Sequence, residues 1–124
     1  MYNRIALLVF TLFYFVIFSA VSLKAQDVSK VAPKNYKVVL DNDEVRVIDD
    51  QSNPGDKAAW HSHPDMVVYV LEGGTSKSTT KDGKSKITEF KKGQTVWMNA
   101  IIHATENIGK TKIHLLLVEL KKPQ

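Results

Sequence analysis

Turn residues recur along most of this chain and separate short runs of β-branched, aromatic and apolar residues. The runs follow one another at a spacing of about eight to twelve residues, which is typical of β-sandwiches and barrels. No segment shows a helical period over ten or more residues. The expected strands are Tyr36–Leu40, Glu44–Asp49, Ala58–His61, Met66–Leu71, Thr75–Thr80, Lys84–Phe90, Gln94–Met98, Ile102–Glu106 and Lys112–Leu120. The chain is therefore predicted to be all-β, with the strands arranged as a sandwich or a barrel.

Two local patterns support this prediction. Asp82-Gly83 stands between two of the runs and predicts a hairpin with a type I′ turn, in which both central residues have positive φ. The segment Ile113–Val118 is almost continuously apolar, which suits a strand covered on both faces, although periodicity alone does not distinguish it from a buried helix.

The first 25 residues have the pattern of an export signal. Arg4 precedes an uncharged run, Ile5–Val21, and the segment ends in Leu23-Lys24-Ala25. We expect residues 1–25 to be a secretory signal peptide cleaved after Ala25, so that the domain is periplasmic or secreted. The alternative is an uncleaved membrane anchor, because the run approaches the roughly 20 residues that span a bilayer.

Composition narrows the function once this segment is set aside. Removing residues 1–25 takes away Arg4 and Lys24 but no acid, which leaves 15 basic against 13 acidic residues. Such a near-neutral domain lacks the basic stripe of an electrostatic nucleic-acid binder. The chain has no cysteine, which excludes disulfides, thiolate metal sites and a cysteine nucleophile.

The pair His61 and His63 carries the most chemical information. Residues i and i+2 of a strand point to the same face, so two imidazoles would lie side by side. Neutral imidazole is the commonest protein ligand for first-row metals, and such a pair would form half of a metal site. The alternative is two partly exposed polar residues at the end of a strand.

The surrounding spacing resembles the cupin superfamily. Gly55, His61, His63 and Gly74 fit its first motif, G-x5-H-x-H-x3,4-E-x6-G, and His103 and Asn107 fit the His and Asn positions of its second. The chain departs from both patterns. Val67 or Val68 stands where the first motif has Glu, while Met98 and Ala100 replace Pro and Gly in the second. The resemblance implies a cupin domain, a double-stranded β-helix or double-sheet jelly-roll barrel, over residues 36–122, after a polar lead-in over residues 26–35.

The same resemblance implies a metal site made of His61, His63 and His103. Val67 cannot ligate, although strand parity counted from His61 places it on the same face. Asp65 is a weaker ligand candidate, with an exposed turn acid as its alternative role. His114 is expected to be a strand residue in or near the core.

Further residues are expected to lie around this site. Asn99, Thr105 and Asn107 are candidates to hydrogen-bond the imidazoles. The candidate pocket residues are Val67, Tyr69, Trp97 and Asn99, and Trp60 and Met98 are further candidates for the barrel mouth. Aromatic and methionine residues at strand spacing are also common in cores.

The resemblance implies a divalent metal cofactor (Fe, Mn, Ni or Zn) and a small-molecule ligand or substrate. Three-histidine cupins without the glutamate include dioxygenases, so a metal-dependent dioxygenase is one expectation. A non-catalytic small-ligand or sugar-binding module is the alternative, and a sugar isomerase or epimerase with Tyr69 or a free acid as base is a third. Cupins often form homodimers, and we expect one here. A membrane partner is expected only if the N-terminal segment is retained.

Overall fold

The computed structural model of the chain describes residues 26–122. The predicted signal peptide, residues 1–25, lies outside the described residues. Within residues 26–122, no helix is long and apolar enough to span a membrane.

The described chain is built almost entirely from strands, as the turn spacing predicts. One short helix precedes nine strands. Their bounds are α1 Val28–Val31, β1 Tyr36–Asp41, β2 Val45–Ser52, β3 Lys57–His63, β4 Met66–Glu72, β5 Gly74–Thr80, β6 Ser85–Phe90, β7 Thr95–Met98, β8 Ile101–Asn107 and β9 Ile113–Leu120. Each expected run corresponds to a strand whose ends differ by only a few residues.

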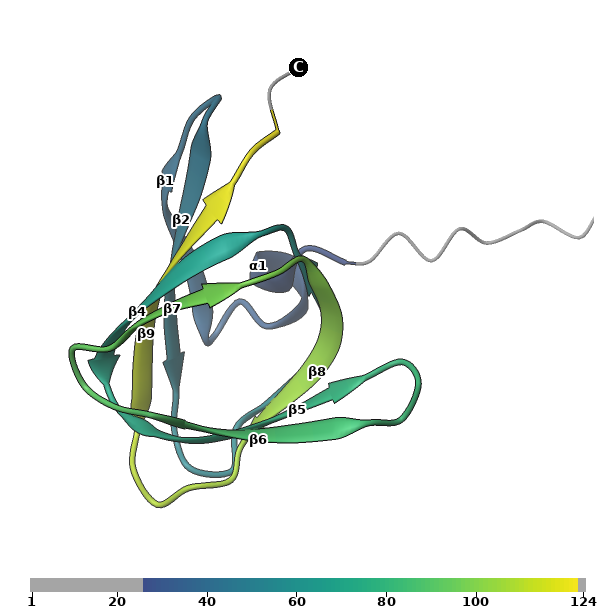
Figure 1. Cartoon of the computed structure of the whole chain (residues 1–124), viewed down its shortest axis with the longest axis vertical. Helices are drawn as coiled ribbons and strands as arrows, with labels where there is room; N and C mark the ends of the chain where they lie inside the picture. The colour runs from purple at the N-terminus through teal and green to yellow at the C-terminus, as the bar shows by residue number, and fades with distance from the viewer. Residues whose placement is uncertain (1–25, 123–124) are drawn as a thin grey trace, which may run out of the picture.

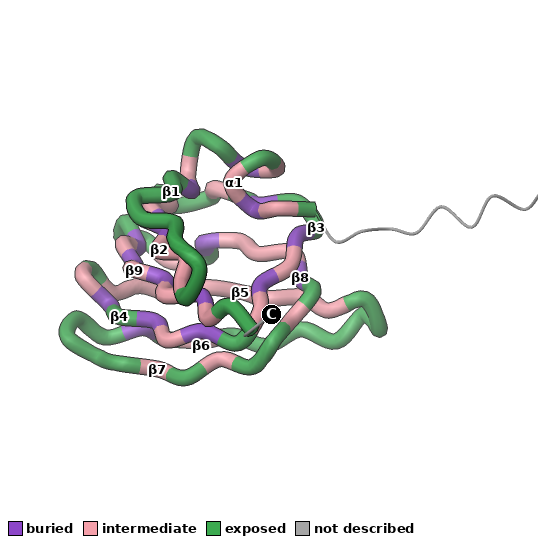
Figure 2. Tube along the Cα trace, turned by 90° about the horizontal axis from the view of Figure 1, so that it is seen from above, coloured by how far each residue is buried: buried purple, intermediate pink, exposed green. Residues whose placement is uncertain are grey.

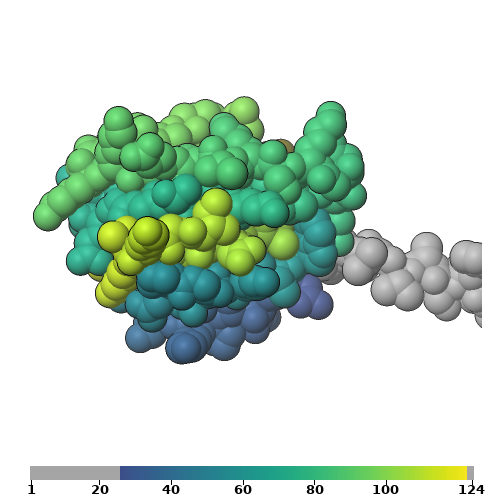
Figure 3. All heavy atoms as spheres, turned by 90° about the horizontal axis from the view of Figure 1, so that it is seen from below, coloured from purple at the N-terminus to yellow at the C-terminus, as the bar shows by residue number. Residues whose placement is uncertain are grey.

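The strands form two sheets that face each other (Figure 1). One has five strands in the order β1-β2-β9-β4-β7, and the other has four in the order β3-β8-β5-β6. All the strand pairs are antiparallel. In space-filling form, the C-terminal part of the chain lies as a yellow band between green and blue parts, as the order β4-β9-β2 requires (Figure 3). This arrangement confirms the predicted double-sheet barrel.

The two sheets contribute differently to the interior. Strand β9 alternates between buried and half-buried residues along its whole length, and β4 buries Met66, Val68 and Val70. The four-stranded sheet instead buries His61, His63 and His103. Buried residues, in purple, follow the strands in Figure 2, while β1 is mostly exposed beyond its first residue. The interior therefore has one wall that is mostly apolar, with Asp50 and Glu119 as its buried acids, and another wall that carries the three histidines.

The polar lead-in contributes to the domain. Val28 in α1 is fully buried in the hydrophobic core, and Asp27 caps the helix by accepting a hydrogen bond from the Ser29 amide. Asp27 also forms an isolated bridge with Ser62, next to the histidines of β3. Residues 26–35 are thus packed against the barrel, which the sequence reading did not anticipate.

The predicted hairpin forms, but its turn is not type I′. Gly83 has φ +81°, whereas no non-glycine residue in the described chain has positive φ, so Asp82 does not. The Gly83 amide donates to the Thr80 carbonyl, and Thr80 and Lys84 pair across a three-residue loop. The Asp82 carboxylate accepts bonds from the Thr80 hydroxyl and the Lys84 amide. Local side-chain bonding therefore favours a three-residue hairpin with glycine in the left-handed position.

Candidate metal centre

The three histidines predicted as ligands lie together inside the barrel. His61 and His63 come from β3, and His103 faces His61 across the β3–β8 ladder. All three are at least nine-tenths buried. One nitrogen from each side chain lies within 4.8 Å of the others, and the ring centroids are 4.6–5.5 Å apart. The group fits a first-row metal ion.

A bulge in β3 sets the direction of these side chains. The β3–β8 register shifts between Ala58 and His61. Ala58 and His61 are three residues apart, so a regular strand would place them on opposite faces, yet both are buried. The extra residue of a bulge rotates the following strand in this way. His61 and His63 then share the inner face, as strand parity predicts for that pair.

Each imidazole is held through Nδ1. His61 Nδ1 lies 2.7 Å from the Ala59 carbonyl oxygen inside the bulge, to which it can donate. His63 Nδ1 donates to Glu119 Oε1 at 2.6 Å, and His103 Nδ1 lies 2.7 Å from the Ser78 hydroxyl. With the proton on Nδ1, the lone pair is on Nε2, as a metal ligand requires.

The surroundings of the Nε2 atoms show whether these histidines suit a metal ion. Nε2 of His61 and Nε2 of His103 are buried, and neither has a hydrogen-bond partner among the described residues. Buried polar atoms without partners are uncommon, and a metal ligand pair is one physical reason for them. Burial lowers the pKa of His61 to about 4 and that of His103 to about 3, with neighbouring imidazoles adding to the effect. Both rings are therefore neutral near pH 7, the form that binds metal.

A chain of charged groups supports His63. Glu119 Oε2 accepts a bond from Arg46 Nε at 2.7 Å, and Arg46 also pairs with Asp27 at 2.6 Å. Burial opposes ionisation of Glu119, but bonds from His63 and Arg46 outweigh it and hold its pKa below the usual value. A carboxylate behind a metal-binding histidine fixes its ring orientation and raises its basicity.

Sequence reasoning did not identify Glu119 or Ser78 in these roles. Glu119 had a detectable signal, because it continues the buried alternation of Ile113, Leu115 and Leu117 on β9 and is the acid in that row. Ser78 had no comparable signal, because its strand Gly74–Thr80 is rich in hydroxyl residues.

The predicted direction of Val67 is wrong. Parity counted from His61 assumed one continuous strand, but β3 ends at His63 and β4 begins at Met66 in the other sheet. Met66 and Val68 are the buried residues of β4, and Val67 alternates with them. Both the predicted inward residue, Val67, and the observed ones, Met66 and Val68, are apolar, so β4 supplies no carboxylate to the histidines.

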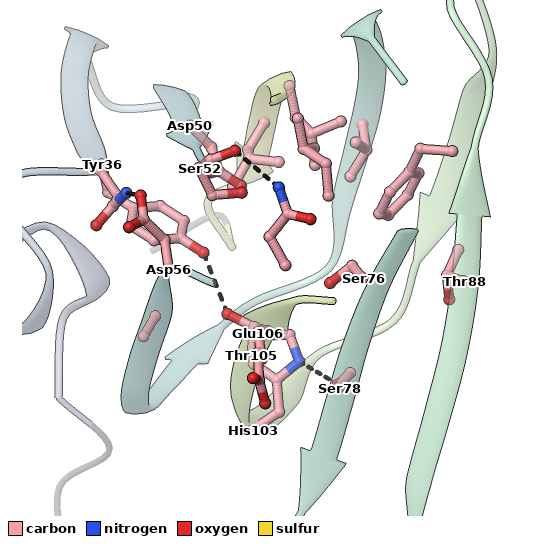
Figure 4. Close-up of a pocket in the computed structure, with 18 of the residues that line it drawn as sticks. Tyr36, Asp50, Ser52, Asp56, Ser76, Ser78, Thr88, His103, Thr105 and Glu106 are labelled. Atoms are coloured by element: carbon pink, nitrogen blue, oxygen red, sulfur yellow. Dashed lines mark hydrogen bonds between the residues drawn. The ribbon is translucent and has the colours of Figure 1, made fainter. Parts of the chain in front are cut away.

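A cavity of about 80 Å³ adjoins the histidines. His63 and His103 line it, with an apolar wall that includes Val68, Leu115 and Leu117. The opposite wall carries hydroxyl groups, including that of Ser76 (Figure 4). The space holds several water molecules or a very small organic molecule.

The candidate pocket residues do not line this cavity. Tyr69, Trp97 and Asn99 are exposed, and Val67 is half-buried on the same outer face. Trp60 is also exposed, where Lys81 lies 4.4 Å above its ring. Val67 and Tyr69 on β4, and Trp97 on β7, alternate with the inward-facing residues of their strands, so parity directs them outward. Met98, also proposed for the mouth, does line the cavity.

The three candidates for holding the imidazoles bond elsewhere. Asn99 accepts a bond from Trp97 Nε1, and Asn107 donates to the carbonyls of Ser52 and Thr111. The Thr105 hydroxyl lies 3.5 Å from that of Tyr36. Asn107 thus ties two loops together beside the barrel end.

The two remaining candidates lie outside the histidine group. Asp65 accepts a bond from the Ala100 amide and is an exposed loop residue. His114 is a half-buried residue of β9 whose Nε2 lies 2.5 Å from Asp49 Oδ1. His114 is therefore a strand residue as expected, but it lies on the outer face of its sheet.

Comparisons with known proteins agree with this architecture. No sequence profile of a protein family matches the chain, and no curated protein matches it in sequence. Among solved structures, a cupin domain from Bordetella pertussis Tohama I is 26% identical, with a TM-score of 0.64 over 70% of this chain and 92% of that one.

Two further solved structures share the fold at lower identity. An RmlC-like cupin family protein with a double-stranded β-helix fold from Methanocaldococcus jannaschii is 14% identical, with a TM-score of 0.56 over 69% of this chain and 78% of that one. A cupin superfamily protein from Desulfitobacterium hafniense DCB-2 is 17% identical, with a TM-score of 0.53 over 70% and 76%.

The facing antiparallel sheets and these likenesses define the class as an all-β double-stranded β-helix. Within that class the chain has the fold of small cupin proteins and is similar in size to the cupin proteins it matches. Its three inward histidines are close enough to hold one metal ion.

Proposed function

We propose that the protein binds one divalent metal ion through Nε2 of His61, His63 and His103. The observation that carries this proposal is the convergence of three buried imidazoles whose Nδ1 atoms are already engaged. Iron, manganese, nickel and zinc all accept imidazole ligands, so the donor set does not select among them.

Elemental analysis of protein produced from the full chain, without added metal, tests this proposal. We expect close to one equivalent of a single transition metal, lost in His61→Ala. His114→Ala is the matched control, because His114 lies on the outer face of β9 and should leave the metal content unchanged. Less than about a tenth of an equivalent in the wild-type protein would refute the site, since a structural set of three histidines binds metal far more tightly than that content implies.

We further propose a dioxygenase-like oxidation of a small organic substrate as the activity. A divalent ion on three neutral imidazoles would keep its +2 charge and supply Lewis-acid chemistry with open positions. Within the chain, Glu119 orients His63 and Ser78 orients His103. The apolar wall of the cavity offers a surface for the carbon skeleton of a substrate.

Oxygen consumption by metal-loaded protein over a panel of β-diketones, thiols and phenolics tests the activity. Consumption that requires both metal and one substrate class supports the dioxygenase. A silent panel, together with a saturable thermal shift on adding sugars, supports the alternative of a non-catalytic binding module. For the isomerase alternative Tyr69 is excluded as the base, because it is exposed on the outer face and does not line the cavity.

Export and dimer formation also remain proposals. For export, the intact mass of protein recovered from a secreting host should correspond to a chain beginning at Gln26.

For the dimer, support comes from an apolar row on the outer face of the five-stranded sheet. Paired positions join its members across all five strands: Leu40, Val47, Val118, Val67 and Trp97. Leu40 and Trp97 are exposed and the three valines between them are half-buried. An apolar patch on the outside of a protein often marks an interface.

A further inference from the structure

Asp50 is a buried carboxyl group inside the barrel that the metal proposal does not use. It lies on β2, paired with Tyr36 of β1 and Leu115 of β9, and it is 6% exposed. Its Oδ1 is buried and has no hydrogen-bond partner among residues 26–122. A carboxyl group in such a place is costly to the fold and calls for a physical reason.

The position of Asp50 suggests that reason. Asp50 lines the same cavity as His63 and His103. Figure 4 shows Asp50 and His103 on opposite sides of this space, reaching it from the two different sheets. A small molecule in the cavity would therefore have the histidines at one end and Asp50 at the other.

We infer that Asp50 recognises the ligand of this cavity by hydrogen-bonding to a hydroxyl group of a small organic acid whose carboxylate faces the histidines. This inference rests on the proposed metal site, because a divalent ion on three neutral imidazoles attracts a carboxylate. Glu119 does not repel that carboxylate strongly, since Arg46 pairs with it.

The protonation of Asp50 is consistent with an anionic ligand. Burial, with a smaller contribution from the charge of Asp49, raises the pKa of Asp50 to about 8. A neutral carboxyl group near pH 7 does not repel an organic anion, and it can both accept and donate a hydrogen bond. Buried acids with raised pKa in a cavity are common at functional sites.

The cavity also restricts the size of the ligand. Its volume of about 80 Å³ accommodates only a short carbon chain between the two polar ends. The apolar wall made by Val68, Leu115 and Leu117 suits methylene groups in between. The ligand class is therefore a short hydroxy acid with its two polar groups at opposite ends.

The test uses cobalt(II)-loaded protein, whose visible spectrum reports anion binding at the metal. Propionate and 3-hydroxypropionate, and butyrate and 4-hydroxybutyrate, form pairs that differ only in the hydroxyl group. We expect wild-type protein to bind the hydroxylated member of at least one pair about fivefold more tightly, as one added hydrogen bond allows. Asp50→Leu should abolish this preference without reducing the cobalt content, and Asp50→Asn should retain part of it.

Asp49→Asn is the matched control, because Asp49 is the neighbouring acid on the outer face of β2 and bonds His114. A preference that persists in Asp50→Leu belongs to chelation by the metal and would overturn the inference. Binding of neither member, or of both equally, would overturn it as well.

Failure of cobalt binding would refute the proposed function and, with it, the placement of the ligand carboxylate at a metal ion, but not the recognition of a hydroxyl group by Asp50. The same acids, titrated into metal-free protein and followed by NMR shifts at Asp50, then decide the inference. A hydroxyl-dependent shift supports it, and no shift refutes it.

Discussion

Glu119 shows how a single residue connects the sheet to the candidate metal site. It takes the buried position on β9 opposite Met66 of β4 and bonds both His63 and Arg46. Its carboxylate therefore lies behind His63 and would not bind a metal ion directly. An ion held by the three histidines would keep a higher net charge than an ion with a directly bound carboxylate.

Glu119→Gln should weaken metal binding by about 10- to 100-fold, because an amide orients His63 less strongly and does not raise its basicity. A competition titration against a chelator measures this change. Glu89→Gln is the control, since Glu89 is an exposed residue of β6 that does not line the cavity. Equal affinities for all three proteins would refute the supporting role of Glu119.

The raised pKa of Asp50 should make the free energy of unfolding depend on pH. Its folded-state pKa of about 8 lies above its ordinary value of 3.8. Between these values the unfolded chain has released the proton and the folded chain has kept it. The stabilising contribution of Asp50 is therefore fully present below about pH 4 and is lost as the pH rises towards 8.

Asp50→Asn removes the titrating group, so the free energy of unfolding of this variant should not fall with pH on account of residue 50. As the pH rises to 8, the variant should therefore become more stable than wild type by a few kcal/mol, on the order that the pKa shift of Asp50 implies. Urea unfolding at pH 5, 6.5 and 8 measures the difference. Asp43→Asn, at an exposed residue of the β1–β2 turn, should follow the wild type. A constant difference between Asp50→Asn and wild type across this range would contradict the raised pKa.

At the scale of the elements, two irregular features determine where side chains point. The bulge in β3 turns both Ala58 and His61 inward and supplies the Ala59 carbonyl that holds His61. The break between β3 and β4 moves the chain from one sheet to the other and resets its parity. Strand alternation held between His61 and His63, which follow the bulge, and failed across the break at Val67.

The link between β4 and β5 depends on close backbone approach. The last glycine of the first cupin-like motif corresponds to Gly74. However, a Cβ on the preceding Gly73 would lie 2.3 Å from the carbonyl oxygen of Phe90. At Gly74 the nearest atom is 2.7 Å away and belongs to the side chain of Ile113. The shorter distance, and a contact with backbone, place the stricter requirement on Gly73.

Gly73→Ala should lower the free energy of unfolding by about 1–3 kcal/mol, the usual cost of forcing atoms into packed space. Glu72→Ala, at the exposed residue beside it, should change it by less than about 0.5 kcal/mol. Chemical denaturation of both variants measures this contrast. Equal stabilities would show that the strand link relaxes without cost.

At the scale of the whole molecule, the outer face of the five-stranded sheet is the surface most suited to a second copy. Its apolar row includes Trp97, 54% exposed, and Leu40, 48% exposed. A two-fold interface buries the same patch on both subunits, so one charge placed in the row enters the interface twice.

Val67→Lys should therefore convert the proposed dimer into a monomer while keeping the metal content, because Val67 points away from the histidines. Light scattering after size-exclusion chromatography gives the mass. Ile87→Lys, on the outer face of the other sheet where Ile87 is 64% exposed, is the control and should stay dimeric. A wild-type protein with the mass of one chain would rule out the dimer.

The sequence by itself determined the all-β class, the approximate bounds of the strands and the three histidines. These features depend on local chemistry: turn residues interrupt the chain, apolar runs favour strands, and a two-residue spacing keeps His61 and His63 on one face. The resemblance of two short motifs then brought in His103, which lies forty residues along the chain from His63.

Only the tertiary structure decided which residues surround those histidines. Ser78, Glu119 and Asp50 come from three strands that are distant in sequence, and they reach the barrel interior through sheet order and register. The outward direction of Val67, Tyr69 and Trp97 was equally hidden, because it depends on where the chain changes sheets. Local pattern fixes the alternation of side chains along a strand, but the pairing of strands fixes which face is the inside.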